Sequence, residues 1–336
     1  MKPAPHPNPQ AQPLNAAKAM SASAQHQGPV RAAIEAVDMR LAECAGTALP
    51  GWRLGWAQVI GRHHPRFSED SLAHHSALQP GGVVGSPLGL FLAVADGVGG
   101  GARGEVASAA LTAHSVALPH ALLGKPEGIA QWMQLAEGQV QLKLREVSHS
   151  PGAATLAAAW LQPAGPSLQR SNGQWQKPCG EGAQGHIMRV GDARLYRFDG
   201  QSLEALTTDQ TYQAVGDPPA EGASPDDPAR MVGTGHTGTP ELQPLHLPWG
   251  HTLLLCSDGL HRGLSTGRMA ELMREGGELS ACALRLALAA RLGGSDDDIT
   301  VLLAQPSLTD DNDNAAPPAP MPSPSPWRSL FKRVFS

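Results

Sequence analysis

The chain has 336 residues, of which 41% are hydrophobic and 16% charged, and its formal net charge at pH 7 is −5. This length allows a large core in one or two domains, and the negative charge argues against nucleic acid as the main partner. The four cysteines lie far apart without a CxxC pair, which argues against a disulfide framework or a cysteine zinc site. We therefore expect a reducing, cytoplasmic location, and the lack of a run of about 18 apolar residues predicts no spanning helix.

Composition divides the chain into regions. Residues 1–29 are rich in Pro, Ala and Gln and have no apolar stretch typical of a secretory signal, so they are predicted to be a disordered extension. Residues 30–306 form the predicted folded domain, which includes a possible helix at 30–45 because apolar residues there have helical spacing. Residues 307–326 are predicted to be a disordered linker, and residues 327–336 a short basic amphipathic helix.

Within the folded domain, apolar runs and alternating patterns predict strands, and apolar residues at helical spacing predict helices. The predicted strands are 52–60, 90–95, 154–161, 186–190, 193–198, 252–256 and 299–304. The predicted helices are 104–116, 127–147, 268–274 and 279–292. The segment 207–241 has little periodicity and is predicted to be a long loop, which in a compact domain is usually functional or mobile.

Carboxylates stand at the ends of these strands. Asp96 and Asp258 each follow an apolar strand, and Asp297 precedes another. In an antiparallel sheet the end of one strand lies beside the start of its neighbour, so we expect all three to project from one sheet edge, joined by Glu69 and Asp70. Such a cluster needs cations to neutralise it, and an oxygen-rich set suits Mg²⁺ or Mn²⁺.

Each of these signals also has a simpler interpretation. Asp96 and the glycines after it could form a tight turn, the run 296–298 could cap a turn, and Glu69 with Asp70 could lie in a solvated loop. The repeated placement at strand ends favours a shared site over these separate explanations.

A series of short motifs occurs in the same order as in a known protein family. The matching stretches are Arg66–Asp70, Asp96–Gly100, Gly104–Ser108, Gly152–Leu156, Val190–Tyr196, Leu206–Gln210, Leu254–Leu260 and Asp297–Val301. In these motifs the chain resembles the metal-dependent protein serine/threonine phosphatases, the PPM or protein phosphatase 2C family, in its bacterial form. The resemblance covers about residues 53–304.

The resemblance implies an α+β fold, a four-layer α-β-β-α sandwich of two antiparallel sheets flanked by helices, with a metal cleft at one sheet edge. It implies hydrolysis of phosphoserine and phosphothreonine in proteins by a water molecule that two Mn²⁺ or Mg²⁺ ions activate. The implied partners are phosphorylated proteins and a cognate bacterial kinase whose action the enzyme opposes, and we expect a monomer.

The family motifs also imply roles for individual residues. Asp96 would bridge the two metals and the Gly97 carbonyl would contact the second metal. Asp258 and Asp297 would hold the first metal, and Glu69 and Asp70 the second.

An arginine would bind the phosphate with two hydrogen bonds. Arg66 and Arg62 both compete for this role, with Arg66 preferred, so the implied catalytic residues are Asp96, Asp258 and Arg66.

The chain departs from the family pattern at several positions. Ser68 stands where the family usually has Asn, and Val98 replaces the His that eukaryotic members use as a general acid. Asp298 replaces the Asn of the last motif and is expected to add charge beside the first metal.

A further departure concerns a third metal. Asp192 matches one ligand of such a site, but Arg262 stands where the family often has another Asp. We therefore expect two metals, with a third site that is weak or filled by Arg262.

Two alternatives stay open from the sequence. The chain could be a phosphatase-like module that binds phosphorylated partners without turning them over. The helix 327–336 could dock through Trp327–Phe335 in a partner's groove or on an anionic membrane surface, which would place the protein peripherally at the inner membrane. Alternatively, this segment could pack on the domain or be disordered.

Overall fold

The computed structural model describes residues 42–49, 51–62, 67–77, 89–98, 103–116, 126–147, 151–164, 181–235, 237 and 241–307. The predicted extension at 1–29, the basic helix at 327–336 and the linker beyond Ser307 lie outside the described residues, as does Arg66.

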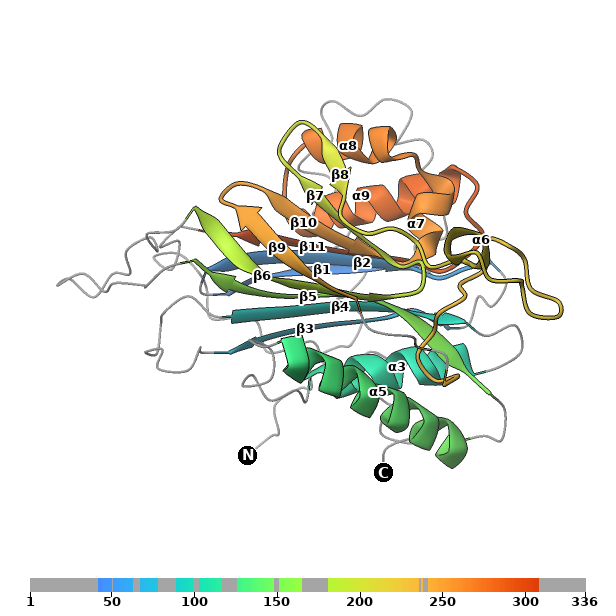
Figure 1. Ribbon diagram of the computed structural model, residues 1–336. Coiled ribbons are helices and arrows are strands. Elements are labelled where there is room, and N and C mark those ends of the chain that lie inside the picture. The colour runs from blue at the N-terminus through green and yellow to red at the C-terminus, as the bar shows by residue number, and fades with distance from the viewer. Residues whose placement is uncertain are drawn as a thin grey trace, which may run out of the picture.

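Two antiparallel sheets form the centre of the described structure (Figure 1). Sheet A has the strand order β1-β2-β11-β10-β7-β8, and sheet B has the order β3-β4-β5-β6-β9. The strands of sheet A are β1 Ala42–Leu49, β2 Trp52–Val59, β7 Arg194–Phe198, β8 Leu203–Ala205, β10 Thr252–Cys256 and β11 Ile299–Pro306. The strands of sheet B are β3 Ser71–Ala77, β4 Gly89–Val98, β5 Ala153–Pro163, β6 Gly182–Val190 and β9 Glu241–Pro248.

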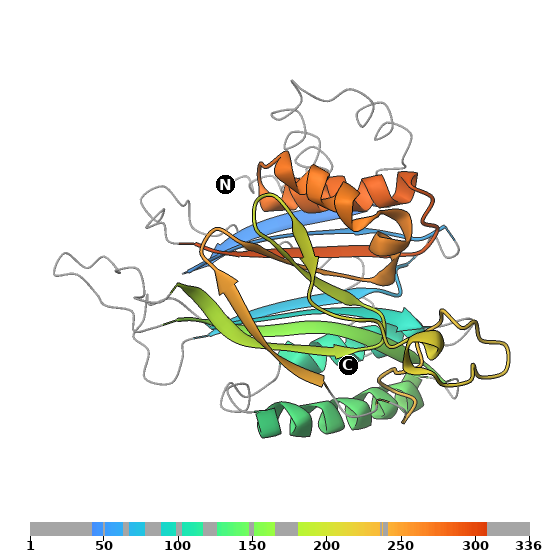
Figure 2. The same cartoon turned by 45° about the horizontal axis from the view of Figure 1, so that its top comes forward.

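Helices cover the outer face of each sheet (Figure 2). The helices are α3 Gly104–Val116, α5 Pro126–Val147, α6 Tyr212–Val215, α7 Asp258–Gly263, α8 Thr266–Arg274 and α9 Leu279–Leu292. Helices α3 and α5 pack on sheet B, and α8 and α9 pack on sheet A. The arrangement is the predicted four-layer α-β-β-α sandwich. None of the described helices is both long and apolar enough to cross a membrane.

Side-chain alternation along the strands explains the layers. In β10, Leu253 and Leu255 point into the space between the sheets, whereas Leu254 and Cys256 pack under the outer helices. Strand β4 has the same pattern, with Leu90, Leu92 and Val94 on the inner face and the residues between them against α3 and α5. Because successive side chains point to opposite faces, a strand with helices on one side and a sheet on the other must be apolar at nearly every position.

The prediction of a helix at 30–45 is wrong where the structure describes it. Residues 42–49 form β1, which pairs with β2 along its whole length from Ala42 opposite Val59 to Leu49 opposite Trp52. Gly51 has a φ of 87° between the two strands, a conformation that favours glycine. The ladder with β2 satisfies the backbone groups that a helix would have satisfied locally, so tertiary pairing outweighs the helical spacing.

Several elements were not predicted. Strands β3, β8 and β9 are short or carry many polar residues, and β9 contains Pro244 at the edge of sheet B. Edge strands are half exposed and lack the apolar runs that identify central strands.

Candidate metal centre

Asp96 lies on the inner face of sheet B. It continues the alternation of Leu92 and Val94 toward the end of β4, so its side chain points toward sheet A. Its Oδ2 accepts a hydrogen bond from the backbone N–H of Asp258, 3.3 Å away, and Asp258 directly follows β10 of sheet A. Asp96 and Asp258 therefore join the two sheets at one end of the sandwich.

Asp258 is the first residue of α7, not part of a turn. The preceding residue Ser257 is buried, and its Oγ accepts a hydrogen bond from the backbone N–H of Thr300 at 2.9 Å. At Gly259 a Cβ atom would collide with the carbonyl oxygen of Asp298, so the start of α7 lies directly against the segment that leads into β11. These contacts hold the Asp258 carboxyl group in a buried position beside the end of β4.

Glu69 and Asp70 enter the same region from the segment before β3. The Glu69 carbonyl accepts hydrogen bonds from the Gly97 N–H at 3.1 Å and from the Ser108 Oγ–H at 2.5 Å. A Cβ atom at Gly97 would lie 2.5 Å from the Glu69 carbonyl oxygen and from the Gly104 carbonyl group, so only glycine allows this close approach. The end of β4, the start of α3 and the Glu69 segment are thereby packed together.

Asp192 lies in the turn where the chain leaves sheet B at β6 and enters sheet A at β7. Gly191 has a φ of 90°, and its N–H donates to the side-chain oxygen of Gln210 at 2.9 Å. Asp192 is buried, and its backbone carbonyl oxygen lies 3.1 Å from Nε2 of His261 on α7.

Burial and mutual repulsion shift the titration of these carboxyl groups. Desolvation raises the pKa of Asp96 well above its ordinary value, and the charges on Asp258 and Asp70 raise it further. The same desolvation raises the pKa of Asp258 to about 7, with Asp192 adding to the increase and Arg262 opposing it. Asp192 is raised to a pKa of about 6 by burial and by Asp209. Such shifts mark a place where negative charges are held together without enough positive charge.

Two carboxylate oxygens of the group are buried without a hydrogen-bond partner. These are Oδ2 of Asp70 and Oδ1 of Asp258. A buried oxygen without a partner is unfavourable by about 1–3 kcal/mol, and more for a charged group, so these atoms fit a ligand that supplies positive charge. The donor set is all oxygen, which suits Mg²⁺ or Mn²⁺. In the positions the described side chains now hold, no three of the Asp, Glu, His and Cys residues form a complete cation site.

Asp297 and Asp298 differ although they are neighbours. Asp297 is half-buried, and its Oδ1 accepts a hydrogen bond from the Asp298 N–H at 2.9 Å. Both oxygens of Asp298 are taken by backbone amides, Oδ1 by Gly61 and Oδ2 by Glu69, each at 2.5 Å. Asp298 therefore holds both ends of the segment between β2 and Asp70, at Gly61 and at Glu69. Desolvation raises the pKa of Asp70, and the charge on Asp298 raises it further.

The expectation that the carboxylates share one sheet edge is wrong in one respect. Asp258 and Asp297 flank adjacent strands of sheet A, as expected, but Asp96 and Asp70 belong to sheet B. Sequence patterns locate strand ends but do not say which sheet a strand joins. The group therefore lies across the common end of both sheets.

The chain is similar to known bacterial serine/threonine phosphatases. No family model matches the chain. The serine/threonine protein phosphatase PstP of Mycobacterium tuberculosis is 30% identical over 221 residues, which is 64% of this chain and 40% of PstP. The serine/threonine phosphatase stp of Listeria monocytogenes is 28% identical over 265 residues, 73% of this chain and 97% of stp. The chain thus spans well under half of the first of these curated relatives.

A solved structure gives the fold. The crystal structure of the catalytic domain of PstP in complex with 2 manganese ions aligns with a TM-score of 0.54 and 24% identity, covering 76% of this chain and 97% of that one. The chain has the fold of the PPM phosphatases. The predicted resemblance to this family is confirmed, and so is the predicted α+β sandwich.

The fold does not decide between Arg62 and Arg66 as the predicted phosphate-binding residue. Arg62 is exposed, and its guanidinium is 2.7 Å from Oδ1 of Asp296, which is also exposed. Arg66 lies outside the described residues. The preference for Arg66 over Arg62 stays a prediction.

The loop predicted at 207–241 is anchored to the rest of the fold by charged residues. At its start, Arg194 binds both oxygens of Asp209, at 2.7 and 2.6 Å. At its end, Glu137 of α5 accepts hydrogen bonds from the N–H groups of Gly233 and Gly235 at 2.6 and 2.7 Å. Because the partners are distant in sequence, no local pattern predicts these contacts.

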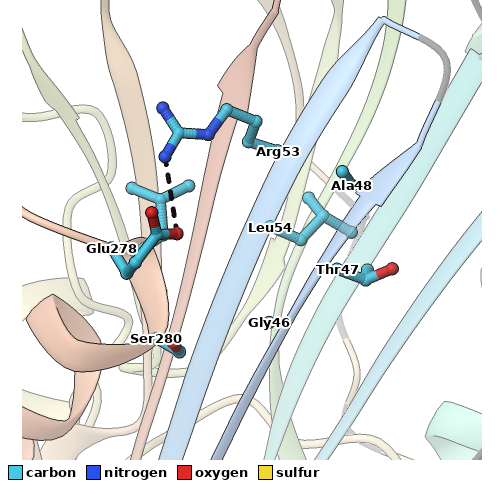
Figure 3. A pocket seen from close by; sticks show the side chains of 8 residues that line it. Gly46, Thr47, Ala48, Arg53, Leu54, Glu278 and Ser280 are labelled. Atoms are coloured by element: carbon cyan, nitrogen blue, oxygen red, sulfur yellow. Dashed lines mark ion pairs between the residues drawn. The ribbon is translucent and has the colours of Figure 1, made fainter. Parts of the chain in front are cut away.

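A separate pocket of about 250 Å³ lies between the β1–β2 hairpin and the start of α9 (Figure 3). It contains the ion pair between Arg53 and Glu278, 3.5 Å apart, and none of the carboxylates described above. The β2 residues that line the pocket, Arg53 and Leu54, lie at the beginning of the strand, whereas the carboxylate group lies near its end. We assign the chemistry to the carboxylate group and not to this pocket.

Proposed function

We propose that the chain is a metal-dependent phosphatase that hydrolyses phosphoserine and phosphothreonine in proteins. The observation that carries this proposal is the pair of buried, unpartnered oxygens of Asp70 and Asp258 within a group of carboxylates from both sheets. Support comes from the curated relatives, which are named serine/threonine phosphatases, and from the PstP catalytic domain that holds two manganese ions.

The proposed roles of these residues follow from their positions. Asp96 lies between the sheets and would hold both cations, with Asp70, Glu69 and the Gly97 carbonyl on one side and Asp258 and Asp297 on the other. When bound, two Mn²⁺ or Mg²⁺ ions lower the pKa of a water molecule so that it can attack phosphorus at neutral pH. Asp192 would contribute to a third, weaker site.

Substrate binding and release would depend on neighbouring groups. Arg66, or Arg62, would bind the phosphate through two hydrogen bonds. Val98 at the end of β4 has no proton to donate, so the leaving serine or threonine oxygen would take its proton from water. The anchored loop at 207–241 would face phosphoprotein substrates, and the enzyme would oppose a bacterial serine/threonine kinase in the cytoplasm as a monomer. Docking of Trp327–Phe335 on the inner membrane or a partner remains part of this proposal.

A second candidate is a phosphatase-like binding module. It is favoured by one observation, the ion pair between Arg262 and Asp258 at 2.7 Å, which occupies one oxygen of a proposed metal ligand. The two candidates differ in turnover and not in binding.

The test is hydrolysis of a phosphothreonine peptide by the full chain after removal of metal with EDTA and titration with Mn²⁺. We expect activity that requires Mn²⁺ and is lost in Asp96→Asn and in Asp258→Asn. The matched control is Asp199→Asn in the β7–β8 turn, an exposed carboxylate that binds its own turn and should keep full activity. Hydrolysis without metal, or hydrolysis that survives either of the first two substitutions, would contradict the mechanism, and peptide binding without hydrolysis would favour the binding module.

A further inference from the structure

Arg262 is a cation already present at the metal centre. It lies four residues after Asp258 on α7, so the two side chains share one face of the helix. Its Nη2 is 2.7 Å from Oδ2 of Asp258. The Asp258 side chain is only 9% exposed, whereas that of Arg262 is 49% exposed, so the pair reaches from the buried carboxylates to solvent.

The charge on Arg262 acts on the whole group and not on one partner alone. Besides Asp258, the carboxylates of Asp192, Asp297 and Asp96 favour its charged form. In return, Arg262 opposes the increase in the pKa of Asp258 and Asp192 that burial and repulsion between carboxylates cause.

The neighbouring guanidinium groups are bound elsewhere. Arg194 binds both oxygens of Asp209, and Arg291 donates to the carbonyl groups of Ile60 and Asp297 at 2.9 and 2.7 Å. His261, the residue before Arg262, is on the same helix, and burial lowers its pKa to about 4, so it adds no positive charge near neutral pH.

These contacts have a direct consequence for a divalent cation. A metal bound by Asp258 must take a carboxylate whose one oxygen is held by a guanidinium and whose other oxygen has no hydrogen-bond partner. A positive charge within about 4–6 Å of a bound cation weakens the binding of that cation, just as a charge at this distance shifts a neighbouring pKa by about 1–3 units. Because its guanidinium is half exposed and its stem is long, Arg262 can turn into solvent without a change in the backbone.

We propose that Arg262 is a built-in counter-cation that neutralises the carboxylate group in the metal-free protein and competes with divalent cations for Asp258. The proposal rests on the metal-binding part of the proposed function and does not require hydrolysis. The proposal predicts two opposite effects of the Arg262 side chain. Arg262 stabilises the protein without metal, and it weakens the binding of metal.

The test measures Mn²⁺ binding by isothermal titration calorimetry, and thermal unfolding in EDTA, on the full chain. Arg262→Gln removes the charge and retains most of the side chain, and it should bind Mn²⁺ about tenfold or more tightly than the unsubstituted protein. In EDTA the same variant should unfold at a lower temperature because Asp258 loses its partner. Arg262→Lys keeps the charge and should stay close to the unsubstituted protein in both measurements.

The matched control is Arg268→Gln on α8. Arg268 is 46% exposed and pairs with Glu271 at 2.7 Å, so it resembles Arg262 in exposure and pairing. Its partner Glu271 is not a member of the proposed metal-binding group. It should change neither measurement. An Mn²⁺ dissociation constant for Arg262→Gln within twofold of the unsubstituted protein, or equal tightening in Arg268→Gln, overturns the proposal. So does a lack of Mn²⁺ binding by both the unsubstituted protein and Arg262→Gln.

Hydrolysis of the phosphopeptide is followed in the same variants. Tightened Mn²⁺ binding without any turnover would support the counter-cation and contradict the proposed phosphatase. Turnover with an unchanged Mn²⁺ dissociation constant in Arg262→Gln would support the proposed phosphatase and contradict the counter-cation.

Discussion

The space between the sheets and the carboxylate end of the sandwich are built from the same strands but have opposite energetics. Strand β4 supplies Leu90, Leu92 and Val94 to the interior and then, in the same alternation, Asp96 to the carboxylate group. Removing leucine from water stabilises the fold, whereas removing a carboxylate from water destabilises it unless a cation or a donor compensates. The packed interior therefore holds together a group of carboxylates that would separate if they were not attached to it.

Asp96→Asn gives the largest expected effect and tests the carboxylate end. Because Asp96 is proposed to hold both cations, its substitution should lower phosphopeptide hydrolysis about a thousandfold or more, since metal ions contribute several kcal/mol to catalysis. The metal-free variant should be at least as stable as the unsubstituted protein, because desolvation and Asp258 both oppose ionisation of Asp96. Activity assays and thermal unfolding in EDTA measure the two effects. A marked loss of stability in EDTA would mean that Asp96 is a structural residue.

Leu92→Ala should show the reverse pattern in the interior. Leu92 is completely buried between the sheets, and its truncation should lower the free energy of unfolding by about 2–5 kcal/mol. Hydrolysis per folded molecule should change little. The control is Leu135→Ala on α5, where the side chain is 50% exposed and little change is expected. Chemical denaturation measures the free energy of unfolding of both variants, and equal losses would show that the interior is not packed as described.

Asp298→Asn lies between the two regions. Its two oxygens each accept a backbone N–H, and an asparagine amide group can accept only one of them while its own N–H₂ faces the other donor. We expect a loss of about 1–3 kcal/mol in unfolding free energy. Asp296→Asn is the control, since Asp296 is exposed and its pair with Arg62 is a surface ion pair worth about 0–1 kcal/mol. Equal stability of the two variants in denaturant titrations would contradict the assigned role of Asp298.

The smallest expected effect is a pH dependence of the metal-free protein. Burial raises the folded-state pKa of Asp258 to about 7 and of Asp192 to about 6, from an ordinary value of 3.8. A raised carboxyl pKa means that the folded state binds the proton more tightly, so this contribution is complete below pH 4 and is lost as the pH rises through 6 to 7.

Unfolding temperatures measured in EDTA should accordingly fall by a few degrees across this range, at about 2–4 °C per kcal/mol for a domain of this size. Asp258→Asn should reduce the fall, because an amide does not titrate. An unfolding temperature in EDTA that rises from pH 5 to 8 would show that the carboxylates are compensated in another way.

Local patterns were sufficient for the central strands and the long helices. Helix α9 occupies the predicted residues 279–292, and α3 the predicted residues 104–116, because both are rich in alanine and leucine, which favour the helix. The pattern failed at residues 42–45, where pairing with β2 decides the conformation. It also gave no sign of the edge strands β3 and β9, whose stability comes from one neighbour each.

The sequence by itself determined which residue types stand at strand ends, and hence that Asp96, Asp258 and Asp297 accompany apolar strands. It could not determine that Asp96 comes from a different sheet than Asp258, because alternation fixes the face of a strand and not the sheet that the strand joins. Only the tertiary structure separated Asp298, whose oxygens accept hydrogen bonds from backbone amides, from Asp258, which pairs with Arg262 through one oxygen and has no hydrogen-bond partner for the other. The physical reason is that the partners of a buried charge are distant in sequence, so its role is set by packing and not by its neighbours in the chain.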